Sequence, residues 1–272
     1  MINIEELTLR YFSNEEPVPY LLDNKFSIYN LDEYIINISP ISVKDWAFFE
    51  CCLDVLMYQQ QDYNDVDIVS ASYLKFLSNY ILPIENENKD KINEFKLRNI
   101  LYKSCGIEYF SYGGVDARGR NCINILSSDG LDSVVATITA KEFDEIKKII
   151  LFQNIPNYDD RYISPDVKEL MAEMNSIKNK DVVNPTLEKM KIFVISKTGF
   201  TMKEINEMTY RTFVQIYKSN VDIDIYFANK ILQASEKYKV EDVIYPLYAK
   251  EKDALAELFS SDKTNADLGI SI

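Results

Sequence analysis

The residues of this chain whose types and spacing could do chemistry are mostly carboxylates. One cluster suggests a calcium-binding loop at first sight: Asp62, Asn64, Asp65 and Asp67. In such a loop the oxygen ligands recur at fixed positions and a glycine makes a sharp turn. Here Val66 stands where a ligand should be, and the cluster contains no glycine. We therefore interpret the segment as a solvated turn and expect no metal site.

Two other carboxylates are each followed, two residues later, by a lysine, as in some nuclease active sites: Glu94–Lys96 and Glu145–Lys147. Both pairs lie within predicted helices and lack a Pro-Asp partner on a preceding strand, so we interpret them as solvated helix faces. The chain has no histidine, the usual general base near neutral pH and the commonest metal ligand. We expect no catalytic residue and no cofactor. A small carboxylate-dependent enzyme is the third of our functional hypotheses.

The charge balance bears on the partners. Thirty basic and 43 acidic residues give a net charge of −13, which disfavours nucleic acid and anionic membranes because both require a cationic face. No apolar run approaches the roughly 18 residues that span a bilayer. The N-terminus lacks the basic region of an export signal. We therefore expect no membrane partner.

The cysteines indicate a reducing compartment. They show no CxxC spacing, and the two adjacent ones fall in a helical pattern that points them to different faces. We predict reduced, mostly buried thiols in a cytoplasmic protein: Cys51, Cys52, Cys105 and Cys122.

The segment 111–120 combines glycines and arginines. It holds three of the seven glycines but lacks the order of a phosphate-binding loop, so nucleotide binding has weak support. One interpretation is a connection between strands. The other is that Arg118 and Arg120, with Tyr112 beside them, bind an acidic surface of a partner protein.

Residues 186–218 resemble the spacing of a helix-turn-helix motif. The second helix would carry three polar residues on its outer face: Arg211, Gln215 and Lys218. A DNA-binding regulator is therefore the alternative function. The acidic balance opposes it, and so do three aromatic residues typical of core anchors: Tyr210, Phe213 and Tyr217. Packed helices joined by a short turn give the same pattern, and we name Tyr210 and Arg211 as candidate partner-binding residues.

The element with the strongest local signals runs from Arg120 to Pro156. It predicts two short strands, a tight turn at Ser128–Gly130 and a helix that begins with a capping box of Thr139 and Glu142. Four apolar residues of this helix recur at helical spacing: Phe143, Ile146, Ile149 and Ile150.

The remaining signals extend this unit on both sides. Before it we predict a hairpin over residues 26–39 and a strand over Ile107–Tyr112. We also predict three helices: Ser42 to Gln60 with Trp46, Phe49, Leu53, Leu56 and Met57 on one stripe, Ile68 to Leu82, and Lys91 to Cys105 with Ile92, Phe95, Ile100 and Leu101. After it the signals are helical, with starts at Pro165, at Asn184-Pro185, at Thr201, at Thr209 and at Leu247.

These elements define the expected fold class. It is α+β, with a small antiparallel meander and packed helices followed by an all-α C-terminal domain. We expect an α+β domain over residues 1–156, a helical domain over 164–260 and a flexible tail over 261–272.

Several short segments resemble tail and baseplate assembly proteins of contractile-tailed bacteriophages: Ile38–Phe49, Tyr73–Leu77 and Ile138–Asn154. The segment Thr198–Phe213 resembles the helical part of tail assembly chaperones from the same gene clusters. The 19 tyrosines and 14 phenylalanines also favour a protein that works through interfaces.

The resemblance implies a non-enzymatic function through protein–protein contacts, as a tail assembly chaperone or a baseplate hub component. The implied partners are other tail or baseplate proteins, the tape measure protein or the hub. The implied location is the host cytoplasm. The protein would act there as a transient chaperone or would be incorporated into the virion. The oligomeric state stays open, and the family has no catalytic residue to carry over.

Overall fold

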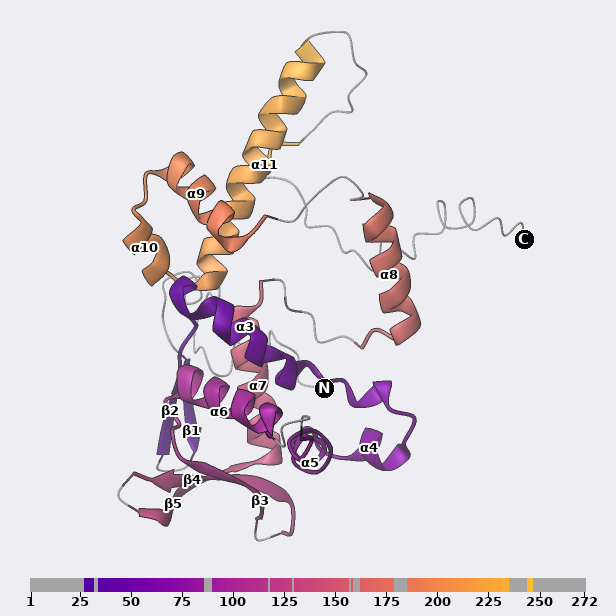
Figure 1. Cartoon of the computed structure of the whole chain (residues 1–272), viewed down its shortest axis with the longest axis vertical. Coiled ribbons are helices and arrows are strands. Elements are labelled where there is room, and N and C mark those ends of the chain that lie inside the picture. The colour runs from indigo at the N-terminus through magenta and orange to yellow at the C-terminus, as the bar shows by residue number, and fades with distance from the viewer. Residues whose placement is uncertain are drawn as a thin grey trace, which may run out of the picture. The chain divides into compact units, whose positions relative to one another are not determined.

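The structure is a computed structural model of the chain, and it describes residues 27–31, 34–85, 90–116, 118–128, 130–156, 158, 162–178, 185–234 and 244–246 (Figure 1). It is mixed α+β with a helical C-terminal region, as predicted. The chain divides into two compact units, Met1–Ile216 and Tyr217–Ile272, called unit 1 and unit 2 below. The boundary expected between residues 156 and 164 stays a prediction. The expected helix from Leu247 and the tail over 261–272 lie outside the described residues.

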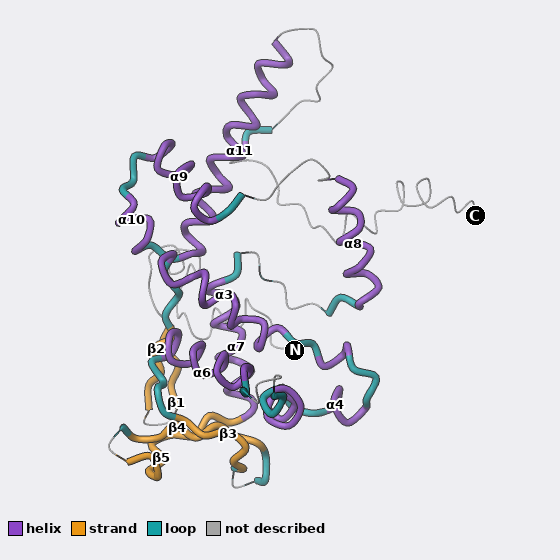
Figure 2. The backbone as a smooth tube through the Cα atoms, viewed as in Figure 1, coloured by secondary structure: helices purple, strands orange, loops and turns teal. Residues whose placement is uncertain are grey.

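All described strands belong to two small antiparallel sheets of unit 1 (Figure 2). The predicted hairpin is confirmed: β1 (Ser27–Leu31) pairs with β2 (Tyr34–Ile38). The predicted meander is confirmed as well, in the order β3 (Phe110–Val115), β4 (Asn121–Ser127), β5 (Gly130–Thr139).

Strand β3 differs from the prediction because it begins at Phe110 and continues through Gly113-Gly114-Val115. The register between β3 and β4 shifts between Tyr112 and Gly114. Gly113 has a φ of 83°, which only glycine adopts readily. Half of the predicted loop 111–120 is therefore strand.

Helix α7 (Ala140–Asn154) has the predicted capping box. The Thr139 amide donates to Glu142 Oε2 at 2.7 Å, and the Glu142 amide donates to the Thr139 hydroxyl at 3.5 Å. The four predicted apolar residues are all buried. They contribute to one core with α3 (Val43–Met57) and α6 (Ile92–Cys105).

The apolar stripes of α3 and α6 are only partly as predicted. On α3, Trp46, Phe49, Leu53 and Leu56 are buried, but Met57 is exposed. On α6, Ile100 and Leu101 are buried, whereas Ile92 and Phe95 are exposed. The buried residues of α6 include Leu97 instead, which belongs to the common core.

The single helix predicted over Ile68–Leu82 is wrong. The structure has a 3₁₀ turn η1 (Gln60–Asp62), then α4 (Val66–Ser70), α5 (Tyr73–Phe76) and a π-helical turn η2 (Leu77–Ile81). The side-chain Nε2 of Gln60 donates to the backbone carbonyls of Ile68 at 2.7 Å and Ala71 at 2.9 Å. Ser72 then caps α5. The break is stable because these side chains satisfy backbone groups that a continuous helix would have paired.

The predicted helices after Pro156 are present as α8 (Pro165–Lys178), α9 (Leu187–Thr198), α10 (Met202–Glu207) and α11 (Tyr210–Ala234). Thr186 caps α9, two residues after the predicted start at Asn184, and Gly199 ends it with a φ of 78°. The predicted capping box of α10 is confirmed, with Thr201 and Glu204 bonded reciprocally.

Within unit 1, the start of α11 is fixed to the β2–α3 junction. The Val43 amide donates to the Met208 carbonyl at 3.0 Å, and the Tyr210 amide donates to the Ile41 carbonyl at 2.9 Å. The rings of Tyr210 and Trp46 stack with centroids 3.6 Å apart. Helices α9, α10 and the beginning of α11 share four buried residues: Val194, Ile205, Phe213 and Val214.

The four cysteines are free thiols, of which only Cys51 is exposed. Burial raises the pKa of the Cys105 thiol to about 12, and burial also raises the pKa of Cys52 and Cys122. Because the thiolate is the reactive form, we expect native protein to react rapidly with DTNB at one thiol and unfolded protein at four. The Cys51→Ser variant should lose the rapid reaction. Two or more rapid equivalents in the native protein would contradict this arrangement.

Candidate functional site

The predicted partner-binding arginines lie on the β3–β4 connection, where hydrogen bonds and an ion pair join residues of the same loop. The Arg120 side chain forms an ion pair with Asp116, at 2.7 Å between Nη2 and Oδ2. The backbone amides of Arg118 and Arg120 both donate to Asp116 Oδ1. The hydrogen bonds from Arg120 hold the Asp116 pKa at about 2. Both arginine side chains are exposed, so a partner could still contact them.

Tyr112 points from β3 to α6. Its hydroxyl donates to Glu94 Oε2 at 2.5 Å, and Arg98 Nη2 donates to Glu94 Oε1 at 2.9 Å. Burial and the bond to Glu94 raise the Tyr112 pKa to about 12. Although burial alone would raise the Glu94 pKa, the bonds from Tyr112 and Arg98 lower it. Glu94 therefore joins the sheet to α6.

Tyr210 and Arg211 belong to a second group of contacts. Arg211 Nη1 donates to the carbonyls of Phe152 and Ile155, at 2.5 and 3.1 Å, and the guanidinium lies over the Phe152 ring. The prediction that Arg211 is on the outer face of a recognition helix is therefore wrong. The five candidate residues fall into two groups, Tyr112 with Arg118 and Arg120, and Tyr210 with Arg211.

The interpretation of Glu94–Lys96 and Glu145–Lys147 as solvated faces is wrong. Glu94 is half-buried in the contacts given above, and Lys96 forms an ion pair with Asp54. Glu145 is buried with 2% of its surface exposed, and the Lys147 ammonium lies 3.3 Å from the centroid of the Tyr73 ring.

The calcium-like cluster has structural contacts. Lys168 on α8 forms an ion pair with Asp62 at 3.4 Å, and Asp65 caps α4 by accepting from the amides of Asp67 and Ile68. Within the described ranges, no group of three or more Asp, Glu, Cys or His side chains is arranged to hold a metal ion.

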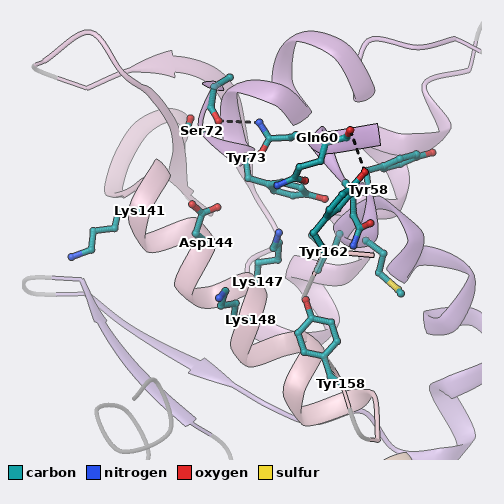
Figure 3. A pocket seen from close by; sticks show the side chains of 15 residues that line it. Tyr58, Gln60, Ser72, Tyr73, Lys141, Asp144, Lys147, Lys148, Tyr158 and Tyr162 are labelled. Atoms are coloured by element: carbon teal, nitrogen blue, oxygen red, sulfur yellow. Dashed lines mark hydrogen bonds between the residues drawn. The ribbon is translucent and has the colours of Figure 1, made fainter. Parts of the chain in front are cut away.

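Sequence reasoning missed a pocket in the described part of unit 1, which has a volume of about 580 Å³. Four separate segments line it: the end of α3 with η1, the start of α5, one face of α7, and the residues after α7 (Figure 3). The lining includes four tyrosines and three lysines: Tyr58, Tyr73, Tyr158, Tyr162, Lys141, Lys147 and Lys148.

Contacts between segments distant in sequence hold the walls of this pocket. The Tyr73 hydroxyl donates to the Val55 carbonyl at 3.1 Å, and its ring stacks with Phe143 at 6.5 Å. The Tyr162 hydroxyl donates to the Gln61 carbonyl at 3.5 Å. In Figure 3, Lys147 points toward Tyr73, whereas Lys141 points away.

Asp144 is the one carboxylate among the residues that line the pocket. Burial raises the pKa of its carboxyl, while Lys147 and Lys148 oppose that rise. Its Oδ1 atom is buried without a hydrogen-bond partner among the described residues. A pocket with several cations, several rings and one carboxylate is suited to binding an anion.

The fold and the site define a mixed α+β chain with a helical C-terminal region and a pocket rich in lysine and tyrosine. Comparison with protein families, with curated proteins and with solved structures finds no match for this chain. No helix in the described part of the chain is long and apolar enough to cross a membrane.

Proposed function

We propose that this chain is a non-enzymatic phage tail or baseplate assembly protein that acts through contacts with other proteins. The resemblance of segments such as Ile138–Asn154 gives the class. The observation that carries the proposal is the apolar face of α11 in unit 2. The partners would be tail or baseplate proteins, the tape measure protein or the hub, met in the host cytoplasm, with the protein then leaving or remaining in the virion.

The apolar face of α11 is large and exposed. Ile225, Phe227 and Ile231 expose 53%, 55% and 71% of their surface. With about 3.6 residues per turn, Val221, Ile225, Ala228 and Leu232 form one row, and Phe227 and Ile231 form a second row, with the exposed Asp224 between the two. Exposed apolar rows on a helix are typical of a protein–protein interface.

The occupant that best fits this face is an amphipathic helix of a tail or baseplate protein, laid along α11 as in other helix-in-groove contacts. The opposite side of the helix carries polar residues such as Ser219, Lys230 and Gln233. Tyr245, the described residue that packs on Tyr226 at 5.1 Å between centroids, lies toward that opposite side. The apolar rows therefore remain exposed for a partner.

The two other functional hypotheses have less support. The DNA-binding alternative needs Arg211 on an outer face, but this side chain bonds to the carbonyls at the end of α7. The carboxylate-dependent enzyme needs two close carboxylates in a cleft. The pocket beside α7 has one, Asp144. A second pocket of about 400 Å³ has two, Asp54 and Asp62, and each forms an ion pair with a lysine.

A pull-down from infected cells with the tagged protein tests the proposal. We expect mass spectrometry to recover tail or baseplate proteins. The double variant Ile225→Asp/Ile231→Asp should reduce their recovery at least about tenfold, because two charges would be buried in an apolar interface. Both residues are exposed, so circular dichroism should show a folded protein.

The matched control places the same two charges on the other side of α11. Ser219→Asp/Gln233→Asp should recover the same partners as the unaltered protein. The proposal fails if tail and baseplate proteins are absent from the unaltered sample, or if both double variants recover them equally. Analysis of purified virions for this chain then separates a transient chaperone from a particle component.

A further inference from the structure

We propose that the pocket lined by α7 and the Leu56–Gln61 segment binds a small organic anion in which a planar ring is joined to a phosphate or carboxylate group. This site goes beyond the assembly function and uses residues of unit 1 only, whereas the partner surface proposed above lies on unit 2. Three properties of the pocket support this assignment: its charge, its aromatic lining and its size.

The charge of the pocket is opposite to that of the chain. The whole chain carries −13, yet Lys147 and Lys148 outnumber the one carboxylate that lines this pocket. The third lysine, Lys141, points away from the pocket and lies 4.0 Å from Glu145. Lys147 and Lys148 are half-buried on α7, where an anion would be less screened by water than at the surface. A lysine ammonium is a compact charge that suits phosphate or carboxylate oxygens approaching from several directions.

Aromatic rings line the pocket, although the Tyr73 ring is only 7% exposed and lies against Lys147. The Tyr73 hydroxyl donates a hydrogen bond to the Val55 carbonyl. This bond fixes the ring, so its position does not depend on a ligand. The Lys147 ammonium sits against this ring at 3.3 Å, which places a cation and an aromatic wall within a few ångströms of each other. Tyr58, Tyr158 and Tyr162 add further rings, and offset or edge contacts with a ligand ring are favourable.

The size of the pocket matches a small molecule. Its volume of about 580 Å³ lies in the range of roughly 300–1,000 Å³ typical of small-ligand sites. The lining also has the mixture typical of such sites, with apolar Leu56, Met57 and Ala71 among the polar groups. A bare inorganic anion would leave these apolar and aromatic walls without a contact.

Isothermal titration calorimetry on the full chain tests the proposal with defined probes. Adenosine monophosphate, phenyl phosphate and indole-3-acetate each combine a ring with an anionic group, and we expect at least one to bind with a Kd below about 1 mM. Adenosine and inorganic phosphate, which each lack one of the two features, should bind at least about tenfold more weakly than the best of the three probes. If none of the three ring-bearing anions binds, or if adenosine or inorganic phosphate binds as well as the best of them, the proposal is overturned.

Variants locate the binding and control for net charge. Lys147→Met/Lys148→Met keeps the apolar stems and should weaken binding of the best probe at least about tenfold. Lys189→Met/Lys203→Met removes the same charge from exposed positions of α9 and α10 and should leave binding unchanged. Asp144→Asn removes the carboxylate without removing a cation, and should tighten binding by about threefold or more. Equal losses in the two lysine pairs, or weaker binding by Asp144→Asn, would place the probe elsewhere and overturn the proposal.

Discussion

The Phe143→Ala variant is expected to lose about 3–5 kcal/mol of its free energy of unfolding, the range measured for phenylalanine truncations in cores. Phe143 lies in the first turn of α7 and exposes 1% of its surface. Its ring stacks with Tyr73 on α5, so it joins two elements that are distant in sequence. Truncation would remove buried apolar surface and leave a cavity that the capped end of α7 cannot close by moving.

Guanidinium chloride unfolding, followed by the fluorescence of the single tryptophan, measures this loss. Trp46 is a suitable reporter because it is 5% exposed and stacked on Tyr210. The midpoint should fall while the slope of the transition stays the same. The free energy of unfolding of an ordinary domain is about 5–15 kcal/mol. After the loss, the variant should therefore be folded in buffer, or close to its unfolding midpoint if the unaltered protein lies at the low end of that range.

Phe95→Ala is the matched control, because sequence reasoning placed both phenylalanines on apolar helix stripes. Phe95 on α6 exposes 52% of its surface and makes an edge contact with Phe48 at 6.3 Å. Its truncation should cost at most about 1 kcal/mol. Similar losses in the two variants would contradict the burial that the structure assigns to these residues.

The contrast between these two residues indicates what sequence alone can predict. The four apolar residues of α7 were predicted correctly because the helix is strongly capped and one broad face packs on the core. On α6 the periodicity fitted two neighbouring faces, and the choice between them depends on which face the rest of the core covers. Periodicity identifies a helix, but the direction of its buried face is a tertiary property.

Long-range bonds explain the other errors. The Gln60 side chain donates to two carbonyls of the helix predicted over Ile68–Leu82 and so helps to break it. Because Gln60 lies outside that segment, the sequence of the segment itself does not predict this contact. The pocket escaped prediction for the same reason, since its lining comes from segments near residues 56–61, 71–73, 141–148 and 158–162. Its one local sign was the tyrosine-rich junction after Pro156, which reads equally well as a connection.

Buried polar side chains at the end of α7 hold the segment between β2 and α3. Asn154 Oδ1 accepts from the Ile41 amide at 2.8 Å, and Gln153 Nε2 donates to the Ile38 carbonyl at 3.2 Å. Both side chains are almost fully buried. The Ile41 carbonyl in turn accepts from the Tyr210 amide, so this segment also receives the start of α11.

The Asn154→Leu variant is therefore expected to lose about 2–4 kcal/mol, although leucine is close to asparagine in size and a better helix former. The Ile41 amide would stay buried without an acceptor, which costs about 1–3 kcal/mol, and the bond to the Ile150 carbonyl would also be lost. Amide hydrogen exchange should show the Ile41 and Tyr210 amides losing protection. Guanidinium chloride unfolding gives the total loss.

Asn99→Leu separates this long-range role from a local one. Asn99 on α6 donates to the carbonyl four residues before it, at 2.8 Å, as Asn154 does to Ile150. Asn99 is half-buried, and its hydrogen bond to the Phe95 carbonyl is exposed and stays within one helix. Its replacement should change the free energy of unfolding by less than about 0.5 kcal/mol. If Asn99→Leu and Asn154→Leu cost the same, the bond to Ile41 contributes nothing, and the packing of the helices alone holds α7 against the β2–α3 segment.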